Sequence, residues 1–504
     1  MAGGPPMAFG EDAPPPLKGA HLALGGFALA LSNFVVVLDI SIANVAVPHI
    51  AGSLAVSPTQ GTWVLTSYAV AEAICVPLTG WLARTFGAVR VFLAAMTGFG
   101  LFSILCGISG SLSMLIAFRV CQGVCGGPIM PMTQTLLMRV FPPDKRGAAL
   151  GLWAMTTVVA PIAGPISGGF IADNWSWHWL FFINIPLALF CLSTGWRLLR
   201  PYETPVQKSP IDFVGLALLI TWVGSLQIML DKGREEDWFS SSFIVMLAVF
   251  AAVGFVAFLI WELTEKHPII DLSVFRNRGF TLAVVTQSVA YAAMFGFIVL
   301  IPLFLQTNLG YTATWAGLAV GWVGMLAVIC SPIVARLVTK VDTRALISFG
   351  VFWLGMVAAL RTQWTTSMGF WTIAFPQMVQ GVGMPFFFVG STALAMASVR
   401  PDQTASGAGI QNFMRTMAGA FATSMFTTVW EHQAKVNRAE LAGLVHPPMS
   451  TGLTAAQARV ALSQLVQTEA VTLATRQVFL LCMVILFAAS ALIWLAPKPG
   501  KQPK

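Results

Sequence analysis

The sequence predicts an all-α integral membrane protein with fourteen transmembrane helices. The chain has 504 residues, of which 57% are hydrophobic and 10% charged, whereas a soluble chain carries about 25% charged residues. Apolar stretches of about 20 residues, long enough to cross the hydrocarbon core of a bilayer as helices, recur along the chain. None shows the period-two alternation of a barrel strand, and only helices or closed barrels satisfy their backbone hydrogen bonds in lipid. The composition therefore argues against a disordered chain, a coiled coil and a secreted disulfide scaffold.

The expected spans follow the apolar stretches in chain order. Before them, residues 1–19 are rich in Pro and Gly and lack the features of a secretory signal, so we expect a disordered tail. The fourteen predicted spans are residues 20–46, 61–83, 89–109, 112–137, 147–170, 179–199, 213–231, 241–261, 279–305, 314–335, 345–362, 369–397, 406–430 and 477–496.

Lys and Arg residues gather on one side of the predicted spans. Of the 28, 19 fall on the side of both termini and seven, Arg361 among them, on the other, while Arg119 and Arg415 lie within spans. Cytoplasmic loops carry an excess of Lys and Arg, so both termini are expected in the cytoplasm. The net charge of +8 then reflects topology and indicates no nucleic-acid partner.

An internal repeat divides the spans into two halves. Gln122-Gly123-Val124 returns as Gln380-Gly381-Val382, and Pro143-Asp144 returns as Pro401-Asp402, in both cases 258 residues later. The two copies have the same orientation, so the repeat is parallel, as in transporters whose two bundles rock around a central site. The predicted units are a six-helix bundle at 20–200, a linker with two extra helices at 201–278, a six-helix bundle at 279–496 that includes an outer-side loop at 431–476, and a cytoplasmic tail at 497–504.

Four short motifs carry a family resemblance. Their main residues are Asp39 and Asn44 in the first span, Gly80, Arg84 and Gly87 in and after the second, Arg119 and Gln122 in the fourth, and Pro161, Gly164, Pro165, Gly168 and Gly169 in the fifth. Together these motifs resemble those of the major facilitator superfamily. The fifth-span motif and the fourteen spans are similar to its drug/proton antiporter branch (EmrB/QacA-like).

The second-span and fifth-span motifs are expected to control conformation. Gly164 and Gly168 are spaced so that helix backbones approach closely, while Pro161 and Pro165 remove backbone donors and permit a bend. A tight static contact and a moving hinge both fit this pattern. The chain departs from the family in the loop motif, which usually has an acidic residue where this sequence has Arg84.

Charged residues within the predicted spans are candidates for proton coupling, because a charge at depth is costly unless it faces a cavity or a partner. Asp39 and Arg119 each lie seven residues from the outer end of their span, or about 10 Å deep, so an ion pair between them is possible. Glu72 lies near the midplane, where the loss of hydration favours the protonated carboxyl group. We predict that Asp39, Glu72 and Arg119 couple protons to transport; a static ion pair and a permanently protonated Glu72 are the alternatives.

A second set of residues is predicted to bind substrate or to gate its path. A lipophilic substrate needs an apolar, deformable cavity with few polar anchors. Arg415 suits an anionic substrate group or a cytoplasmic gate, whereas the aromatic candidates could also serve as packing or face lipid. The candidates are Asn44, Gln122, Gln287, Tyr291, Phe295, Phe387 and Arg415.

The resemblance implies proton-coupled efflux of lipophilic drugs across a bacterial inner membrane. It further implies a tripartite pump with a periplasmic adaptor (EmrA-like) and an outer-membrane channel (TolC-like), with the loop at 431–476 on the docking side. A dedicated exporter or importer of one metabolite is the alternative. The six histidines form no cluster and the chain has no ATP-binding Walker motif, so we expect neither an enzyme nor a cofactor or metal site.

Overall fold

The computed structural model describes residues 15–207, 210–338, 340–400, 403–444 and 455–498, and within these ranges it contains helices and no strand. Eleven of the described helical segments are long and apolar enough to cross a membrane, and two bent helix pairs bring the number of candidate spans to thirteen. The predicted tail at residues 1–19 lies outside the described residues up to position 14, as does the tail at 497–504 from position 499.

The N-terminal bundle consists of the helices before residue 200. Its longest helix, α1, packs along α8 and α10, and α3 packs against α6. The helices are α1 (Gly19–Ser53), α2 (Pro58–Gly61), α3 (Trp63–Cys75), α4 (Thr79–Phe86), α5 (Ala88–Gly107), α6 (Leu112–Gly126), α7 (Ile129–Val140), α8 (Arg146–Asn174), α9 (Trp179–Phe182) and α10 (Asn184–Leu198).

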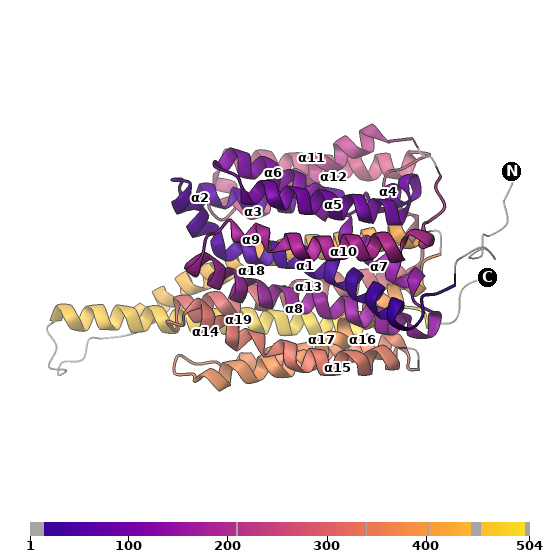
Figure 1. Ribbon diagram of the computed structural model, residues 1–504. Helices are drawn as coiled ribbons and strands as arrows, with labels where there is room; N and C mark the ends of the chain where they lie inside the picture. The colour runs from indigo at the N-terminus through magenta and orange to yellow at the C-terminus, as the bar shows by residue number, and fades with distance from the viewer. Residues whose placement is uncertain (1–14, 208–209, 339, 401–402, 445–454, 499–504) are drawn as a thin grey trace.

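Two inserted helices and the C-terminal bundle complete the fold (Figure 1). The first inserted helix packs against α3 of the N-terminal bundle and against α18 of the C-terminal bundle. The inserted helices are α11 (Phe213–Lys232) and α12 (Ser242–Thr264), and the C-terminal helices are α13 (Arg278–Thr307), α14 (Ala313–Gly321), α15 (Val323–Leu337), α16 (Thr343–Arg361), α17 (Phe370–Ala397), α18 (Thr404–Leu444) and α19 (Ala455–Leu492).

The span expected at residues 61–83 is not one straight helix. It consists of α3 and α4, whose axes differ by 58°. Pro77 lies in the break between them, where its ring nitrogen has no hydrogen to donate to the helix. The fifth span also bends, by 41° between residues Arg146–Pro161 and Ile166–Ala172.

Helices α18 and α19 reach well beyond the bundle. They have 41 and 38 residues, and at 1.5 Å per residue each is nearly twice as long as a hydrocarbon core of about 30 Å is thick. Figure 1 shows this hairpin projecting from the end opposite to the first and last described residues. We call the end that carries Gly19 and Leu495 the terminal face and the other end the hairpin face. The segment at 431–476, expected as a loop, is therefore largely helical, with positions 445–454 outside the described residues.

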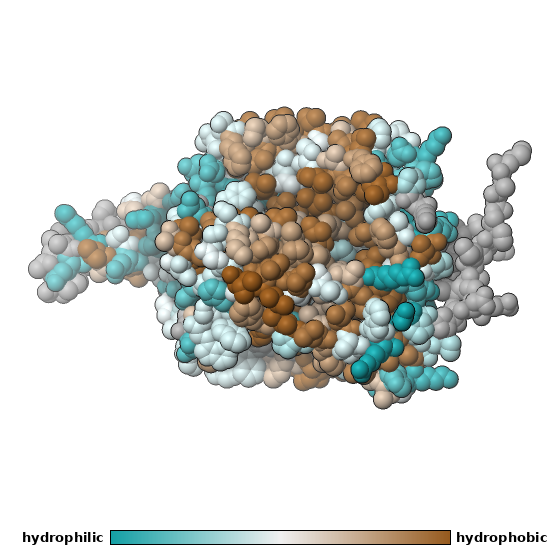
Figure 2. All heavy atoms as spheres, turned by 45° about the horizontal axis from the view of Figure 1, so that its top comes forward, coloured by the Kyte–Doolittle hydropathy of each residue, from teal (hydrophilic) through white to brown (hydrophobic). Residues whose placement is uncertain are grey.

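Helix α18 contains the span expected at 406–430 but is not among the thirteen apolar candidates. Many of its inward-facing residues are polar, because the helix packs against α4, α7, α13 and α19 instead of facing lipid on every side. A total of fourteen spans is compatible with this arrangement. Figure 2 shows hydrophobic residues over the middle of the visible surface and hydrophilic residues toward its two ends, as a bilayer requires.

Candidate functional site

An ion pair lies buried in the N-terminal bundle. Arg119 of α6 places Nη1 2.6 Å from Oδ2 of Asp39 on α1, and neither side chain is exposed. The other carboxylate oxygen, Oδ1, accepts hydrogen bonds from Asn184 Nδ2 at 2.6 Å and from Gln122 Nε2 at 3.2 Å. The charge of Asp39 is thus neutralised by one guanidinium and solvated by two amides, which is the arrangement that a buried charge requires.

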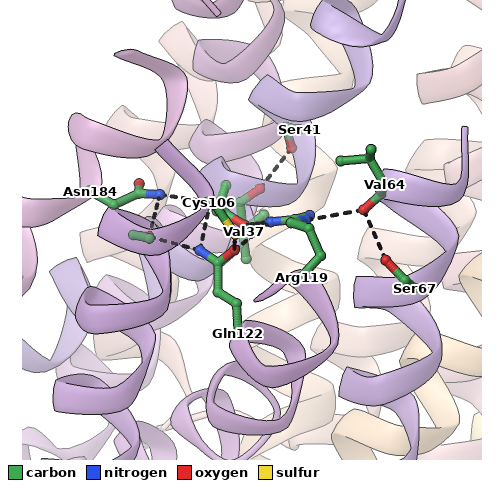
Figure 3. A network of polar contacts seen from close by, with 10 residues as sticks. Val37, Ser41, Val64, Ser67, Cys106, Arg119, Gln122 and Asn184 are labelled. Atoms are coloured by element: carbon green, nitrogen blue, oxygen red, sulfur yellow. Dashed lines mark hydrogen bonds and ion pairs between the residues drawn. The ribbon is translucent and has the colours of Figure 1, made fainter. Parts of the chain in front are cut away.

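Gln122 and the guanidinium of Arg119 are held in place from several helices. Gln122 follows Arg119 by three residues on α6, so both side chains face α1. Nη1 of Arg119 donates to Gln122 Oε1 at 2.8 Å, and Nε donates to the carbonyl of Val64 at 3.1 Å. Figure 3 shows Arg119 between Gln122 and Val64, with Asn184 at the other end of the network. Both groups of the pair belong to the N-terminal bundle and are fixed within it.

Glu72 lies apart from this pair, near the end of α3, and is buried with 4% of its surface exposed. Among charged groups, Arg415 of α18 acts on it most strongly, followed by Arg119 and Asp39. Arg415 belongs to the other bundle. The strongest charged influence on this buried carboxyl group therefore comes from a guanidinium of the other bundle.

Arg415 is 3% exposed and lies among aromatic and thioether groups. Its Cζ is 5.3 Å from the centre of the Trp153 ring and 5.7 Å from that of Tyr291, and Nη2 lies 3.1 Å from Sδ of Met130. Nη1 has no hydrogen-bond partner among the described residues. This environment suits a lipophilic ligand with an acceptor group, because an unpartnered buried N–H is stabilised by any acceptor it meets.

The remaining candidates for substrate binding do not form one group. Tyr291 stacks on Phe295 at 5.4 Å, with Arg415 nearby, whereas Phe387 is fully buried inside the C-terminal bundle. Its neighbour Phe388 is the ring that contacts Tyr291, at 6.0 Å. Asn44 is exposed on α1, and Gln122 belongs to the Asp39 network. Of the predicted set, the structure brings Tyr291, Phe295 and Arg415 together.

The glycines of the predicted conformational motifs lie at close helix contacts. A Cβ atom on Gly164 would be 2.4 Å from Cβ of Ser41, and one on Gly168 would be 2.9 Å from the carbonyl oxygen of Ile42, both on α1. Larger residues would separate α1 from α8, so these positions fix the helix spacing. Half-buried Pro161 and Gly169 lie on the same helix, while the side chain of Pro165 lies outside the described residues.

The turn after α4 carries Gly80, Arg84 and Gly87. Gly87 has φ +93°, a backbone conformation that favours glycine, and Gly80 packs against α18. The carboxylate at this turn comes from Glu203 of the linker, which accepts hydrogen bonds from the backbone N–H groups of Val89 and Arg90 at 2.9 and 3.1 Å. Arg84 contributes its carbonyl oxygen to the same segment, as acceptor for the N–H of Gln207 at 2.8 Å.

Arg361 forms a second buried centre that the sequence did not suggest. We expected it in an outer loop, and that expectation is wrong, since it is the last residue of α16 and 0% exposed. Helical side chains tilt toward the N-terminus of their helix, so one at the C-terminal end reaches back into the bundle. Nη2 donates to Gln380 and, at 2.7 Å, to Gln377, and Cζ lies 4.8 Å from the ring centre of Phe297.

The two buried centres occupy equivalent positions of the repeat. Ser103, Arg119, Gln122 and Asp39 are followed, 258 residues later in each case, by Arg361, Gln377, Gln380 and Phe297. In the first centre Gln122 donates to Ser103 at 2.8 Å, and in the second Arg361 donates to the equivalent Gln380. The two centres use equivalent positions with different residues. The guanidinium is at position 361, equivalent to Ser103 and not to Arg119, and Phe297 stands where the first centre has the carboxylate of Asp39.

These features define a class of protein: a multi-pass α-helical membrane transporter built from two related bundles. Residues 29–423 match the family model described as Major Facilitator Superfamily, and the chain belongs to that family. Its solved relatives share the fold. The human organic anion transporter MFSD10 (TETRAN) has a TM-score of 0.59 at 12% identity, covering 93% of this chain and 100% of that one. A bacterial homolog of the human lysosomal transporter Spinster, inward-facing and unoccupied, has a TM-score of 0.53 at 14% identity, covering 95% and 98%.

Curated relatives are much closer in sequence. The chain is 43% identical over 496 residues to the multidrug export protein EmrB of Escherichia coli (strain K12), which covers 96% of this chain and 97% of that protein. It is 41% identical over 496 residues to the fatty acid resistance protein FarB of Neisseria gonorrhoeae, covering 96% and 98%. The similarity extends over nearly the whole of each chain, so it includes both bundles and the inserted pair.

Proposed function

We propose that this transporter exports lipophilic compounds across the bacterial inner membrane in exchange for protons. The observation that carries the proposal is the buried Glu72, on which the buried Arg415 of the other bundle acts more strongly than any other charged group. A carboxyl group in this position has two states. Ionised, it attracts the guanidinium of the other bundle; protonated, it leaves the guanidinium free for an anionic or polar group of a substrate.

The surroundings of Arg415 support a lipophilic substrate. Trp153, Tyr291 and Met130 supply apolar and polarisable surface, and the unpartnered Nη1 supplies one polar anchor. The names of the curated relatives, multidrug export and fatty acid resistance, point in the same direction. A dedicated exporter or importer of a single metabolite is the second candidate, because the same groups could serve one fixed ligand.

The proton gradient can supply the required energy. One proton moving through 100 mV supplies about 2.3 kcal/mol, which sustains a gradient of about fifty-fold for a neutral substrate. Asp39 and Arg119 both influence Glu72 electrostatically. Their fixed positions would support coupling by keeping the electrostatic potential at Glu72 constant within the N-terminal bundle. We place both termini, and with them the terminal face, in the cytoplasm, because most Lys and Arg residues fall on that side.

The test uses purified protein in lipid vesicles with an imposed pH gradient. We expect accumulation of a lipophilic dye that stops when an uncoupler is added. Glu72→Gln should still bind the dye but lose at least tenfold in gradient-driven transport, because the amide cannot release a proton. Glu262→Gln, at the buried glutamate of α12, is the matched control and should transport normally. Wild-type rates for Glu72→Gln would refute proton coupling at this residue, and counterflow of one metabolite without dye transport would favour the second candidate.

We further propose that the α18–α19 hairpin docks a periplasmic adaptor protein, which would connect to an outer-membrane channel. Beyond the bundle the hairpin exposes Leu444, Val460 and Leu465, with 76, 59 and 57% of their surfaces accessible. Exposed apolar side chains on a projecting element are typical of a protein contact. Val460→Asp with Leu465→Asp should abolish co-purification of the adaptor and spare transport in vesicles; unchanged co-purification would contradict the proposal.

A further inference from the structure

We propose that Gln134, Gln411 and Asn412 form an uncharged lock that closes the path between Arg415 and the terminal face. The inference deepens the proposed transport function, since it names the residues that keep the candidate site closed on one side. It rests on hydrogen bonds that run from one bundle to the other.

Gln134 is joined to the C-terminal bundle in both directions. Its Oε1 accepts from Asn412 Nδ2 at 2.9 Å, and its Nε2 donates to Gln411 Oε1 at 3.0 Å. Gln411 in turn donates to Gln287 Oε1 at 2.5 Å and to Thr392 Oγ1 at 3.2 Å. One glutamine of α7 is thereby tied through α18 to α13 and α17.

All of these amides are buried. Gln134 is 0% exposed, Asn412 is 1% exposed and Gln411 is 3% exposed. A buried amide that loses its partner is destabilised, because it is shielded from water and has no hydrogen bond. Water must therefore enter the junction before the lock can open. The contact is therefore either fully made or replaced by water, which gives the junction two distinct states.

The lock lies one helical turn nearer to the terminal face than the candidate site. Gln411 and Arg415 are four residues apart on α18, and Gln134 and Met130 are four residues apart on α7. Met130 contacts Arg415, and Gln134 contacts Gln411. The two helices thus present matched layers about 6 Å apart along their axes, with the guanidinium in one layer and the amides in the next.

Close backbone contacts seal the junction beyond the lock. A Cβ on Gly80 of α4 would be 2.8 Å from Cα of Ser406 on α18, and a Cβ on Gly147 of α8 would be 2.5 Å from the carbonyl oxygen of Ala335 on α15. Both contacts join the N-terminal to the C-terminal bundle near the terminal face. With the amide layer between these glycines and Arg415, the structure is closed on that side.

The test measures the distance between the bundles at the terminal face. Spin labels are placed at Arg90 and Lys340, which are exposed on the N-terminal and C-terminal bundle, in a variant without native cysteines. Gln134→Leu should raise the population with a long inter-label distance by about five-fold for each ordinary hydrogen bond lost. Gln227→Leu, at a buried glutamine of α11, is the matched control and should leave the distances unchanged.

A second variant guards against misfolding. Gln134→Asn keeps the amide but shortens its reach, and should shift the distances in the same direction if Gln134→Leu cannot be purified as a single species. Unchanged distances in a monodisperse Gln134 variant would overturn the lock. The measurement needs neither substrate nor a proton gradient, so absence of dye transport by the wild type would refute the proposed function and leave the lock standing.

Discussion

Asp39→Asn should destabilise the protein more than any other isosteric substitution within the spans. The carboxylate neutralises Arg119 at 2.6 Å and accepts from Gln122 and Asn184, in a site where none of these side chains is exposed. An asparagine keeps one acceptor oxygen, loses the charge and brings two N–H donors into a site that already has donors in excess. Removing one partner of a buried ion pair costs about 3–5 kcal/mol, a large share of a net stability of about 5–15 kcal/mol.

The assay heats purified protein in detergent and measures, at each temperature, the fraction that remains monodisperse. We expect a large fall in the midpoint temperature for Asp39→Asn and a partial recovery for Asp39→Asn combined with Arg119→Gln, because the second substitution removes the orphaned charge. Glu72→Gln is the control for loss of a buried carboxyl group without a close ion pair. Equal midpoints for Asp39→Asn and wild type would refute the view that this pair stabilises the bundle.

Three further predictions concern Arg361, Gly80 and the pair formed by Asp342 and Arg344 at the start of α16. Arg361→Gln should lower the unfolding midpoint less than Arg119→Gln, because it leaves neutral amides unpaired and no carboxylate; an equal or larger loss would contradict this. Gly80→Val should raise the population open at the terminal face, since its side chain would overlap the α18 backbone, and unchanged inter-label distances would exclude this contact as a barrier. Arg344 holds the pKa of Asp342 below its ordinary value by a side-chain hydrogen bond. The pair should stabilise the folded protein by about 0.2–1 kcal/mol, as is usual for a partly exposed ion pair. This contribution is present at neutral pH and is lost as the pH falls through the lowered pKa of Asp342. The stability difference between wild type and Asp342→Asn should therefore vanish in acid; a difference that persists there would mean that the pair is not its cause.

The sequence was sufficient for the features that depend on length and period. Apolar stretches of span length predicted the helices, and equal depth predicted that Asp39 and Arg119 could meet, because depth along a helix follows directly from residue number. The bend between α3 and α4 was within reach of the same reasoning, since Pro77 interrupts the span.

Features that depend on rotation about helix axes were not predictable in this way. Phe387 and Phe388 are adjacent, and only the packing of α17 decides that the second faces Tyr291. Gln134 and Gln411 are polar residues in apolar helices like several others, and nothing local marks them as partners. The repeat did contain a usable signal for Arg361, because it lies 258 residues after Ser103, the same offset that separates Gln122 from Gln380.

The buried charges of this transporter divide by the bundles that supply them. Asp39 and Arg119 both come from the N-terminal bundle, so a rotation of one bundle against the other leaves their 2.6 Å contact intact. Glu72 and Arg415 come from different bundles, so the same rotation changes the distance between them and with it the cost of ionising the carboxyl group. The first pair lies within one rigid body and would support coupling only indirectly, whereas the second would link the protonation of Glu72 to the angle between the two bundles. For that reason we expect coupling to depend on Glu72 and Arg415, and the stability of the N-terminal bundle to depend on Asp39 and Arg119.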